Sequence, residues 1–130
     1  MEFNPREITL IYNFNKRGDR ESIAYAKQMA ANVNEVDISK SPLNERQMAQ
    51  LLDKLNVGIE DIIDKKSDIY RDKYKDTKMM ESDWLGVIKH EPNLMKTPIG
   101  ILDDRSIICD LPSHILSLDK GQGYDQNMKT

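Results

Sequence analysis

The sequence I-T-L-I-Y-N-F-N-K-R-G-D-R, residues 8–20, joins an apolar run to the start of a helix. Its first part is rich in β-branched and aromatic residues and is almost continuously apolar, which predicts a central strand buried on both faces. A short loop follows, and the helix begins just after it. The first N–H groups of a helix lack intrahelical partners and attract anions. Lys16, Arg17 and Arg20 add positive charge at the same place.

After this loop, the sequence predicts a helix and then a second strand. Asp19 is the expected N-cap. Apolar or small residues then recur at helical intervals to about Ala31, namely Ile23, Ala26, Met29 and Ala30. Residues 33–38 alternate in polarity and predict a short strand. Because a helix lies between the two strands, we expect them to be parallel.

The middle of the chain predicts a series of helices. The first begins with a capping box of Asn44 and Gln47 and ends at Asn56, a residue that tolerates the left-handed conformation. Its apolar stripe consists of Met48, Leu51, Leu52 and Leu55. A short helical turn is expected over residues 59–63. The charged residues 67–76 predict a surface helix or a long loop.

A further helix begins at residues 81–83 and carries Trp84 on its core side. It ends near His90, because Pro92 disfavours helical geometry at the residue before it. Two apolar runs, residues 99–102 and 106–109, predict an antiparallel hairpin.

The C-terminal part is expected to close the domain. The turn of the hairpin is Asp103-Asp104, and Pro112 begins a last helix with three inward residues, Ile115, Leu116 and Leu118. The order of elements predicts an α/β sandwich with a mixed sheet of about four strands, the thioredoxin arrangement. Residues 1–120 form one domain, and the polar residues 121–130 predict a disordered tail.

Three stretches resemble the arsenate reductase and Spx family of thioredoxin-like proteins. They are the loop Ile11–Arg20, the helical stretch Leu51–Lys65, and Pro92-Asn93-Leu94-Met95-Lys96-Thr97-Pro98-Ile99. The likeness covers residues 8–118 and implies the thioredoxin-like fold with a helical insertion. It also implies that Pro98 follows a cis peptide bond, where the ordinary alternative is a trans proline that opens a strand.

The same resemblance implies that the catalytic residues are replaced. The family's reactive cysteine falls at Arg17. The three arginines that bind the oxyanion in arsenate reductases fall at Asp64, at Thr97, and near Asp110 or Leu111. Reduction of arsenate needs a thiolate, which arginine cannot supply. We therefore expect no catalytic residue in this loop.

Composition restricts the class of protein. The chain has 130 residues, a formal net charge of −3 and one cysteine, Cys109, so no internal disulfide can form. Its charge does not favour nucleic-acid binding, and no apolar run approaches the roughly 18 residues of a membrane span. These features predict a cytoplasmic protein.

The candidate ligand-binding residues are those of the loop and of the proline turn, namely Lys16, Arg17, Gly18, Asp19, Arg20, Thr97 and Pro98. The alternative is that the loop charges are simply solvated and Asp19 caps the helix. Cys109 lies in an apolar strand and is expected to be buried and inert. His90 and His114 have no spacing that suggests a metal site, so we expect no metal.

Two functions follow from these observations. The preferred hypothesis is a non-catalytic binding or regulatory module without a cofactor. Its partner would be a protein, the transcription machinery if it acts as Spx does, or a small anion. The alternative is an arsenate-reductase-like oxidoreductase that uses a thiol from glutathione or from a glutaredoxin or thioredoxin partner. The sequence does not indicate the oligomeric state.

Overall fold

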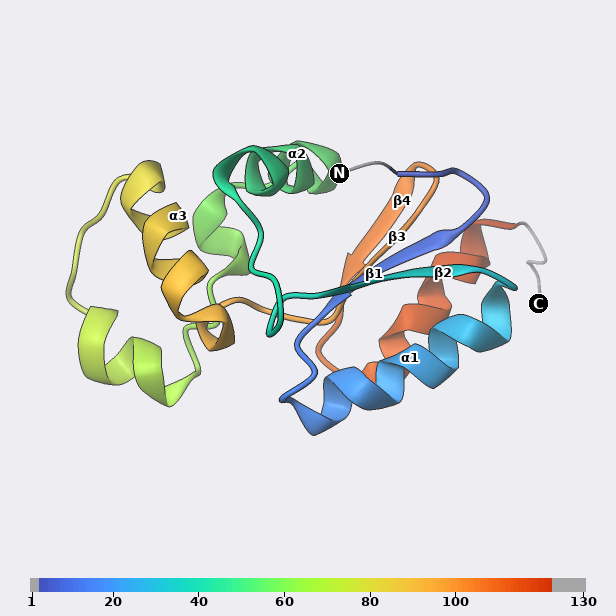
Figure 1. The fold of residues 1–130 in the computed structure, drawn as a ribbon, viewed down its shortest axis with the longest axis horizontal. Helices are drawn as coiled ribbons and strands as arrows, with labels where there is room; N and C mark the ends of the chain where they lie inside the picture. Colours follow the sequence, from blue (N-terminus) through green and yellow to red (C-terminus); the bar gives the residue numbers. More distant parts are fainter. Residues whose placement is uncertain (1–2, 123–130) are drawn as a thin grey trace.

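The computed structural model describes residues 3–122 and contains a four-stranded mixed sheet in the order β2-β1-β3-β4 (Figure 1). β1 (Ile8–Tyr12) pairs in parallel with β2 (Val33–Asp37) and antiparallel with β3 (Ile99–Leu102). β3 forms a hairpin with β4 (Arg105–Ile108). The predicted α/β sandwich with two parallel strands and a closing hairpin is confirmed.

β1 is the central strand, and all of its residues are buried. Successive side chains of a strand point to opposite faces. Ile8 and Leu10 accordingly pack in the core on one face of the sheet, and Ile11 packs in the core on the other. This arrangement explains the continuous apolar run, because both faces of β1 are covered.

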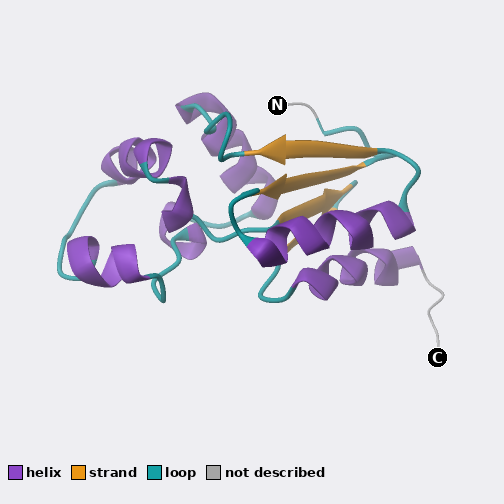
Figure 2. Cartoon of the chain, turned by 60° about the horizontal axis from the view of Figure 1, so that its bottom comes forward, coloured by secondary structure: helices purple, strands orange, loops and turns teal. Residues whose placement is uncertain are grey.

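Two helices cover one face of the sheet. α1 (Arg17–Met29) and the 3-10 helix η4 (Pro112–Gln122) lie side by side below the strands (Figures 1 and 2). Ile115 and Leu118 of η4 are buried against β1 and α1, as the sequence predicted. Gly100 of β3 leaves the space that these two side chains fill.

Several element ends differ from the prediction. α1 ends at Met29, before the predicted Ala31, because Ala30 has extended backbone geometry (φ −141°, ψ 141°). β4 covers residues 105–108 rather than 106–109. Cys109 lies beyond the strand, and its N–H donates to the carbonyl of Pro98 (2.9 Å).

The other face of the sheet carries α2 (Glu45–Leu55) and the helical insertion that follows it (Figure 1). The predicted capping box is present, with hydrogen bonds of 2.7 and 3.0 Å between Asn44 and Gln47. Asn56 ends α2 in the left-handed conformation (φ 58°), also as predicted.

The insertion consists of four helices, η1 (Ile59–Ile62), the π-helix η2 (Tyr70–Tyr74), α3 (Glu81–His90) and η3 (Pro92–Leu94). The predicted surface helix or loop at residues 67–76 contains η2. Its two tyrosines pack on Trp84, with ring centroids 6.3 and 5.8 Å from that of the indole.

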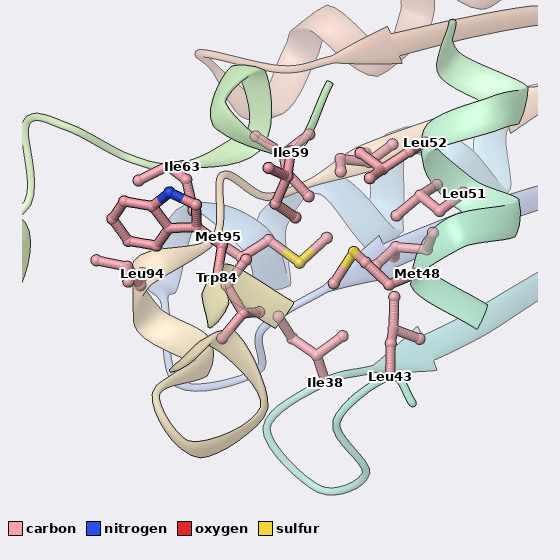
Figure 3. Packing of buried hydrophobic residues seen from close by; sticks show 14 of the residues in the cluster. Ile38, Leu43, Met48, Leu51, Leu52, Ile59, Ile63, Trp84, Leu94 and Met95 are labelled. Atoms are coloured by element: carbon pink, nitrogen blue, oxygen red, sulfur yellow. The ribbon is translucent and has the colours of Figure 1, made fainter. Parts of the chain in front are cut away.

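A single core joins the sheet to the insertion. Figure 3 shows Trp84 beside Ile63 and Leu94, with the sulfur atoms of Met48 and Met95 between the insertion and α2. Met48 is buried, as predicted, whereas Met29 is half-buried.

The predicted disordered tail, residues 121–130, begins too early, because residues 121 and 122 belong to η4. η4 continues to Gln122, and residues 123–130 lie outside the described residues. Within residues 3–122, no helix combines the length and the apolar character that a membrane span requires.

Candidate functional site

Asn13 fixes the loop that follows β1, and its side chain is fully buried. Its Oδ1 accepts the N–H of Asn15 (3.0 Å), and its Nδ2 donates to Oδ1 of Asn93 (2.6 Å). The N–H of Lys16 donates to the carbonyl of Asn13 (2.9 Å) and closes the turn. Asn13 therefore ties the start of α1 to the insertion. Sequence reasoning missed this role, although a polar residue directly after an apolar strand was a signal for it.

Asp19 does not cap α1, so that prediction is wrong. The helix begins at Arg17 with Lys16 as its N-cap, and Lys16 makes no capping side-chain bond. Asp19 lies in the first turn, is 3% exposed, and accepts the N–H of Asn13 through Oδ2 (2.8 Å). A carboxylate in the first turn interacts favourably with the helix dipole. The chain thus places an anionic group of its own at the helix start.

Lys16 connects the helix start to the Thr97-Pro98 turn. Its Nζ donates to the carbonyl of Met95 (3.1 Å) and to Oγ1 of Thr97 (3.3 Å). The Thr97 hydroxyl also hydrogen-bonds the carboxylate of Asp19. The Thr97-Pro98 peptide bond is cis, as the resemblance implied. Four of the predicted site residues are therefore together here: Lys16, Asp19, Thr97 and Pro98.

The two arginines of the loop point elsewhere. Arg17 pairs with Glu21 (3.3 Å), and its side chain is 88% exposed. Arg20 donates through Nη1 to the carbonyl of Phe14 (2.6 Å) and stacks on the Phe14 ring. Each cation thus has a partner within the chain, and the three basic side chains of the loop do not converge on one point.

Gly18 lies in the first turn of α1 and faces the start of η4. A Cβ atom at this position would lie 3.4 Å from Cγ of Pro112. This is an ordinary van der Waals distance, so the space beside Pro112 would accommodate an alanine at this position.

Burial dominates the titration of Asp19. Loss of solvent raises the pKa of this carboxyl above its usual range. The hydrogen bonds from Thr97 and from the N–H of Asn13 oppose that shift, as does the charge of Lys16. The cluster therefore holds a carboxyl group whose charged form is only partly compensated by its neighbours.

A polar cleft of about 670 Å³ opens beside the Thr97-Pro98 turn. The resemblance aligned oxyanion-binding arginines with Asp64, with Thr97, and with Asp110 or Leu111. Asp64, Thr97 and Asp110 line the cleft. Two backbone hydrogen bonds of 2.7 Å build one wall, from Asp64 N–H to Leu94 O and from Lys96 N–H to Ile62 O. The cleft is thus formed where the insertion meets the proline turn.

Three lysines that line the cleft were missed from the sequence, namely Lys65, Lys66 and Lys96. Lys65 pairs with Glu60 (3.3 Å). Lys66 is exposed and Lys96 is half-buried. The signal was present, because Lys65 and Lys66 directly follow Asp64, and Lys96 directly precedes Thr97. Lysines and carboxylates therefore share the walls of this cleft.

Cys109 also lines the cleft but is only 5% exposed. Burial raises the pKa of its thiol to about 12, and the carboxylates of Asp19 and Asp110 act in the same direction. A thiol with this pKa is protonated at neutral pH and is a poor nucleophile. The prediction of a buried thiol is confirmed.

No metal centre is visible within residues 3–122, because no three His, Cys, Asp or Glu side chains gather there closely enough to hold an ion. His90 ends α3, and His114 lies in η4, where its Nδ1 accepts the N–H of Leu111 (3.4 Å).

No family model and no curated protein matches this sequence. Solved structures do match. A proposed arsenate reductase of Yersinia pestis has 20% identity and a TM-score of 0.74, over 85% of this chain and 99% of its own. An arsenate reductase from Vibrio cholerae has 14% identity and a TM-score of 0.73, and the match covers 88% of this chain and 98% of that protein. An arsenate-reductase-related protein from Brucella melitensis has 14% identity and a TM-score of 0.63, and the match covers 92% of this chain and 99% of that protein.

These identities are low, so the likeness shows the fold alone. This chain has the thioredoxin-like fold of arsenate-reductase-family proteins, and it covers nearly the full length of each of them.

Proposed function

We propose that this protein is a non-catalytic binding module built on the arsenate reductase fold. The observation that carries the proposal is the state of Cys109, the only cysteine of the chain, which is buried with a pKa of about 12. Reduction of arsenate requires a thiolate that attacks the arsenic and then leaves as a mixed disulfide. The resemblance to the family places Arg17 where the reactive cysteine would be, and an arginine cannot perform that step.

The binding face in this proposal is the cleft beside the Thr97-Pro98 turn, together with the predicted loop at the start of α1. The cleft presents both signs of charge, with Lys66 and Lys96 on its lining together with Asp64 and Asp110. A ligand with carboxylates and an ammonium group, such as glutathione, matches that mixture better than a simple oxyanion does. A simple oxyanion would face the carboxylates of Asp64 and Asp110.

Calorimetric titration with glutathione, and separately with sulfate, tests this binding. We expect glutathione to bind with a Kd of about 1 mM or tighter. Lys96→Ala should weaken it roughly three- to tenfold, the effect of one charge-assisted hydrogen bond. Arg46→Ala, on the exposed side of α2, removes the same charge away from the cleft and should have no effect. If neither glutathione nor sulfate binds, the small-ligand form of the proposal is wrong and a protein partner becomes the candidate.

The second candidate is an oxidoreductase that receives its thiol from glutathione or a glutaredoxin. The size of the cleft and its position beside the cis proline turn favour it. Incubation with arsenate, glutathione, glutaredoxin, glutathione reductase and NADPH separates the two. We expect no NADPH consumption above background. Turnover that persists in Cys109→Ser would overturn the non-catalytic proposal.

The proposal includes a cytoplasmic location and leaves room for a regulatory protein partner. The single cysteine and the charged composition support the location. The resemblance to Spx proteins, which bind the transcription machinery, supports the regulatory role.

A further inference from the structure

The hydroxyl group of Thr97 lies between an ammonium group and a carboxylate. Lys16 donates through Nζ to its Oγ1 atom (3.3 Å), and the hydroxyl is also hydrogen-bonded to Asp19. An ammonium group only donates hydrogen bonds and an ionised carboxylate only accepts them, so the Thr97 proton must point at Asp19. A hydroxyl has one proton and two lone pairs. With one lone pair taken by Lys16, Thr97 keeps a single lone pair for any further partner.

Thr97 also lines the cleft beside the proline turn. While Asp19 is ionised, the Thr97 side chain can therefore offer a ligand in the cleft only an acceptor. A group that binds there has to supply an N–H or O–H, as an ammonium group or an amide does. A sulfate or carboxylate oxygen would instead meet a lone pair, and the carboxylate of Asp110, which lines the same cleft, repels it as well.

Protonation of Asp19 reverses this pattern. The N–H of Asn13 holds Oδ2 of Asp19 (2.8 Å), and the Asp19 side chain is 3% exposed, so its added proton finds an acceptor at Thr97 and not in solvent. Thr97 then accepts from both Asp19 and Lys16, and its two lone pairs are occupied. Its own proton is left to turn towards the cleft, where it can donate to an oxyanion.

Two other titratable groups interact with Asp19, namely the ammonium of Lys16 and the thiol of Cys109. Burial raises the pKa of that thiol to about 12, so it stays protonated while Asp19 titrates. Lys16 donates to the carbonyl of Met95 as well as to Thr97, which anchors the ammonium beside the turn. The Thr97 hydroxyl is therefore the group that passes the charge state of Asp19 to the cleft.

We propose that Asp19, acting through the Thr97 hydroxyl, selects which ligand group binds at this wall of the cleft. When Asp19 is ionised, the wall takes a hydrogen-bond donor such as an ammonium group. When Asp19 is neutral, the wall takes an oxyanion. This selection rests on the proposed function, because it needs a cleft that binds small ligands. Asp19 is a positioning residue here, since it acts on the ligand only through Thr97.

Asp19→Asn fixes the neutral state for a binding experiment. Its amide oxygen can accept the N–H of Asn13, which directs its NH₂ group to Thr97. Titrations at about pH 8 with sulfate, and separately with the diamine putrescine, compare this variant with the wild type. We expect Asp19→Asn to bind sulfate roughly three- to tenfold more tightly, the effect of one charge-assisted hydrogen bond. Putrescine should bind to it more weakly than to the wild type.

Thr97→Val separates the hydroxyl from the charge of Asp19. In the Thr97→Val background, Asp19→Asn should lose most of its effect on both probes. An effect of the same size in both backgrounds would overturn the proposal, because the charge of Asp19 would then act without the hydroxyl. Asp104→Asn and Thr77→Val remove an exposed carboxylate and an exposed hydroxyl away from the cleft, and neither should change the affinities.

A second measurement needs no ligand. If the Thr97 hydroxyl donates to the ionised carboxylate, its removal in Thr97→Val should raise the pKa of Asp19 further, as measured by NMR titration of the carboxyl carbon. An unchanged pKa would overturn the proposal and leave glutathione binding untouched. If the pKa responds but no variant binds sulfate, putrescine or glutathione, the proposed binding in the cleft is wrong, and the ligand selection is wrong with it.

Discussion

A buried carboxyl group at the start of α1 makes the stability of this protein depend on pH. Because burial raises the pKa of Asp19, the folded state holds this proton more tightly than the unfolded chain does. The contribution of Asp19 is therefore most favourable below the unfolded value near 3.8 and is lost as the pH rises through the raised folded pKa.

Asp19→Asn should remove this dependence while keeping an oxygen that can accept the N–H of Asn13. We expect the free energy of unfolding of the wild type to fall relative to that of the variant as the pH rises from about 4 to 7. Urea unfolding at a series of pH values measures it. A constant difference between the two proteins would mean that the pKa of Asp19 is the same in the folded and unfolded states.

Cys109 should be almost inert towards thiol reagents in the folded protein. With a pKa of about 12, only about one thiol in 100,000 is ionised at pH 7, and the side chain is 5% exposed. The rate of labelling by a disulfide reagent should therefore be limited by opening of the folded structure. Labelling should become fast only in urea. Rapid labelling of the native protein at pH 7 would show an accessible thiolate and would revive the enzyme hypothesis.

At the residue scale, the sequence indicated the site only where the signal was local. The positive loop and the buried cysteine could both be read from neighbouring residues. The bonds from Lys16 to Thr97 and from Asn13 to Asn93 join residues about 80 positions apart. No local pattern encodes such pairs, and the choice of Asp19 as N-cap failed because its partner, the N–H of Asn13, lies in the preceding loop.

At the scale of single elements, α2 depends on its capping box. Asn44 Oδ1 accepts the N–H of Gln47, which would otherwise have no intrahelical partner. Asn44→Ala should lower the free energy of unfolding by about 1 kcal/mol, within a range of about 0.5–2. Urea unfolding gives the value, and Arg46→Ala in the same helix is the control. An equal loss in both variants would show that the cap is not the cause.

The contact between β3 and η4 depends on Gly100. A Cβ atom there would clash with Cδ1 of Ile115 and lie 2.9 Å from Cδ1 of Leu118, and Ile115 is fully buried. Gly100→Ala should therefore cost about 1–3 kcal/mol by overpacking. Ile115→Val removes the clashing methyl group and should cost about 0.5–1.5 kcal/mol alone.

Because these two changes act on the same space, they should not be additive. The double variant Gly100→Ala with Ile115→Val should be more stable than the sum of the single effects. Thermal or urea unfolding of the four proteins completes the cycle. Strict additivity would mean that η4 moves away from β3 as a whole instead of adjusting at Ile115.

For the whole molecule, the order of elements could be predicted because each strand and cap has a local signature. The apolar run of β1, the Asp103-Asp104 turn and the Asn44 cap are examples, and the parallel pairing follows from the helix between β1 and β2. The cis bond at Pro98 was predicted from the resemblance alone. The resemblance was also the only reason to expect Asp64 and Thr97 in one site, and both line the same cleft. The π-helix at residues 70–74 was not predicted, because its tyrosines are placed by packing on Trp84 rather than by a helical repeat.

The hydrophobic core that joins the sheet to the insertion predicts how the molecule unfolds. Trp84 is the only tryptophan, and it lies in one hydrophobic cluster with Ile11, Ile99 and Ile101 of the sheet. If the insertion and the sheet share this core, they should unfold together in one cooperative step. Tryptophan fluorescence, which reports the insertion, and far-UV circular dichroism, which reports all elements, should give the same urea midpoint.

Ile11→Val tests the coupling from the sheet side, since it removes one buried methyl group from the central strand. We expect it to lower both midpoints equally, with a cost of about 0.5–1.5 kcal/mol. A fluorescence midpoint that precedes the dichroism midpoint, or that Ile11→Val leaves in place, would show that the insertion unfolds as a separate unit. In that case the cleft beside Thr97, which is built from both parts, would open before the sheet is lost.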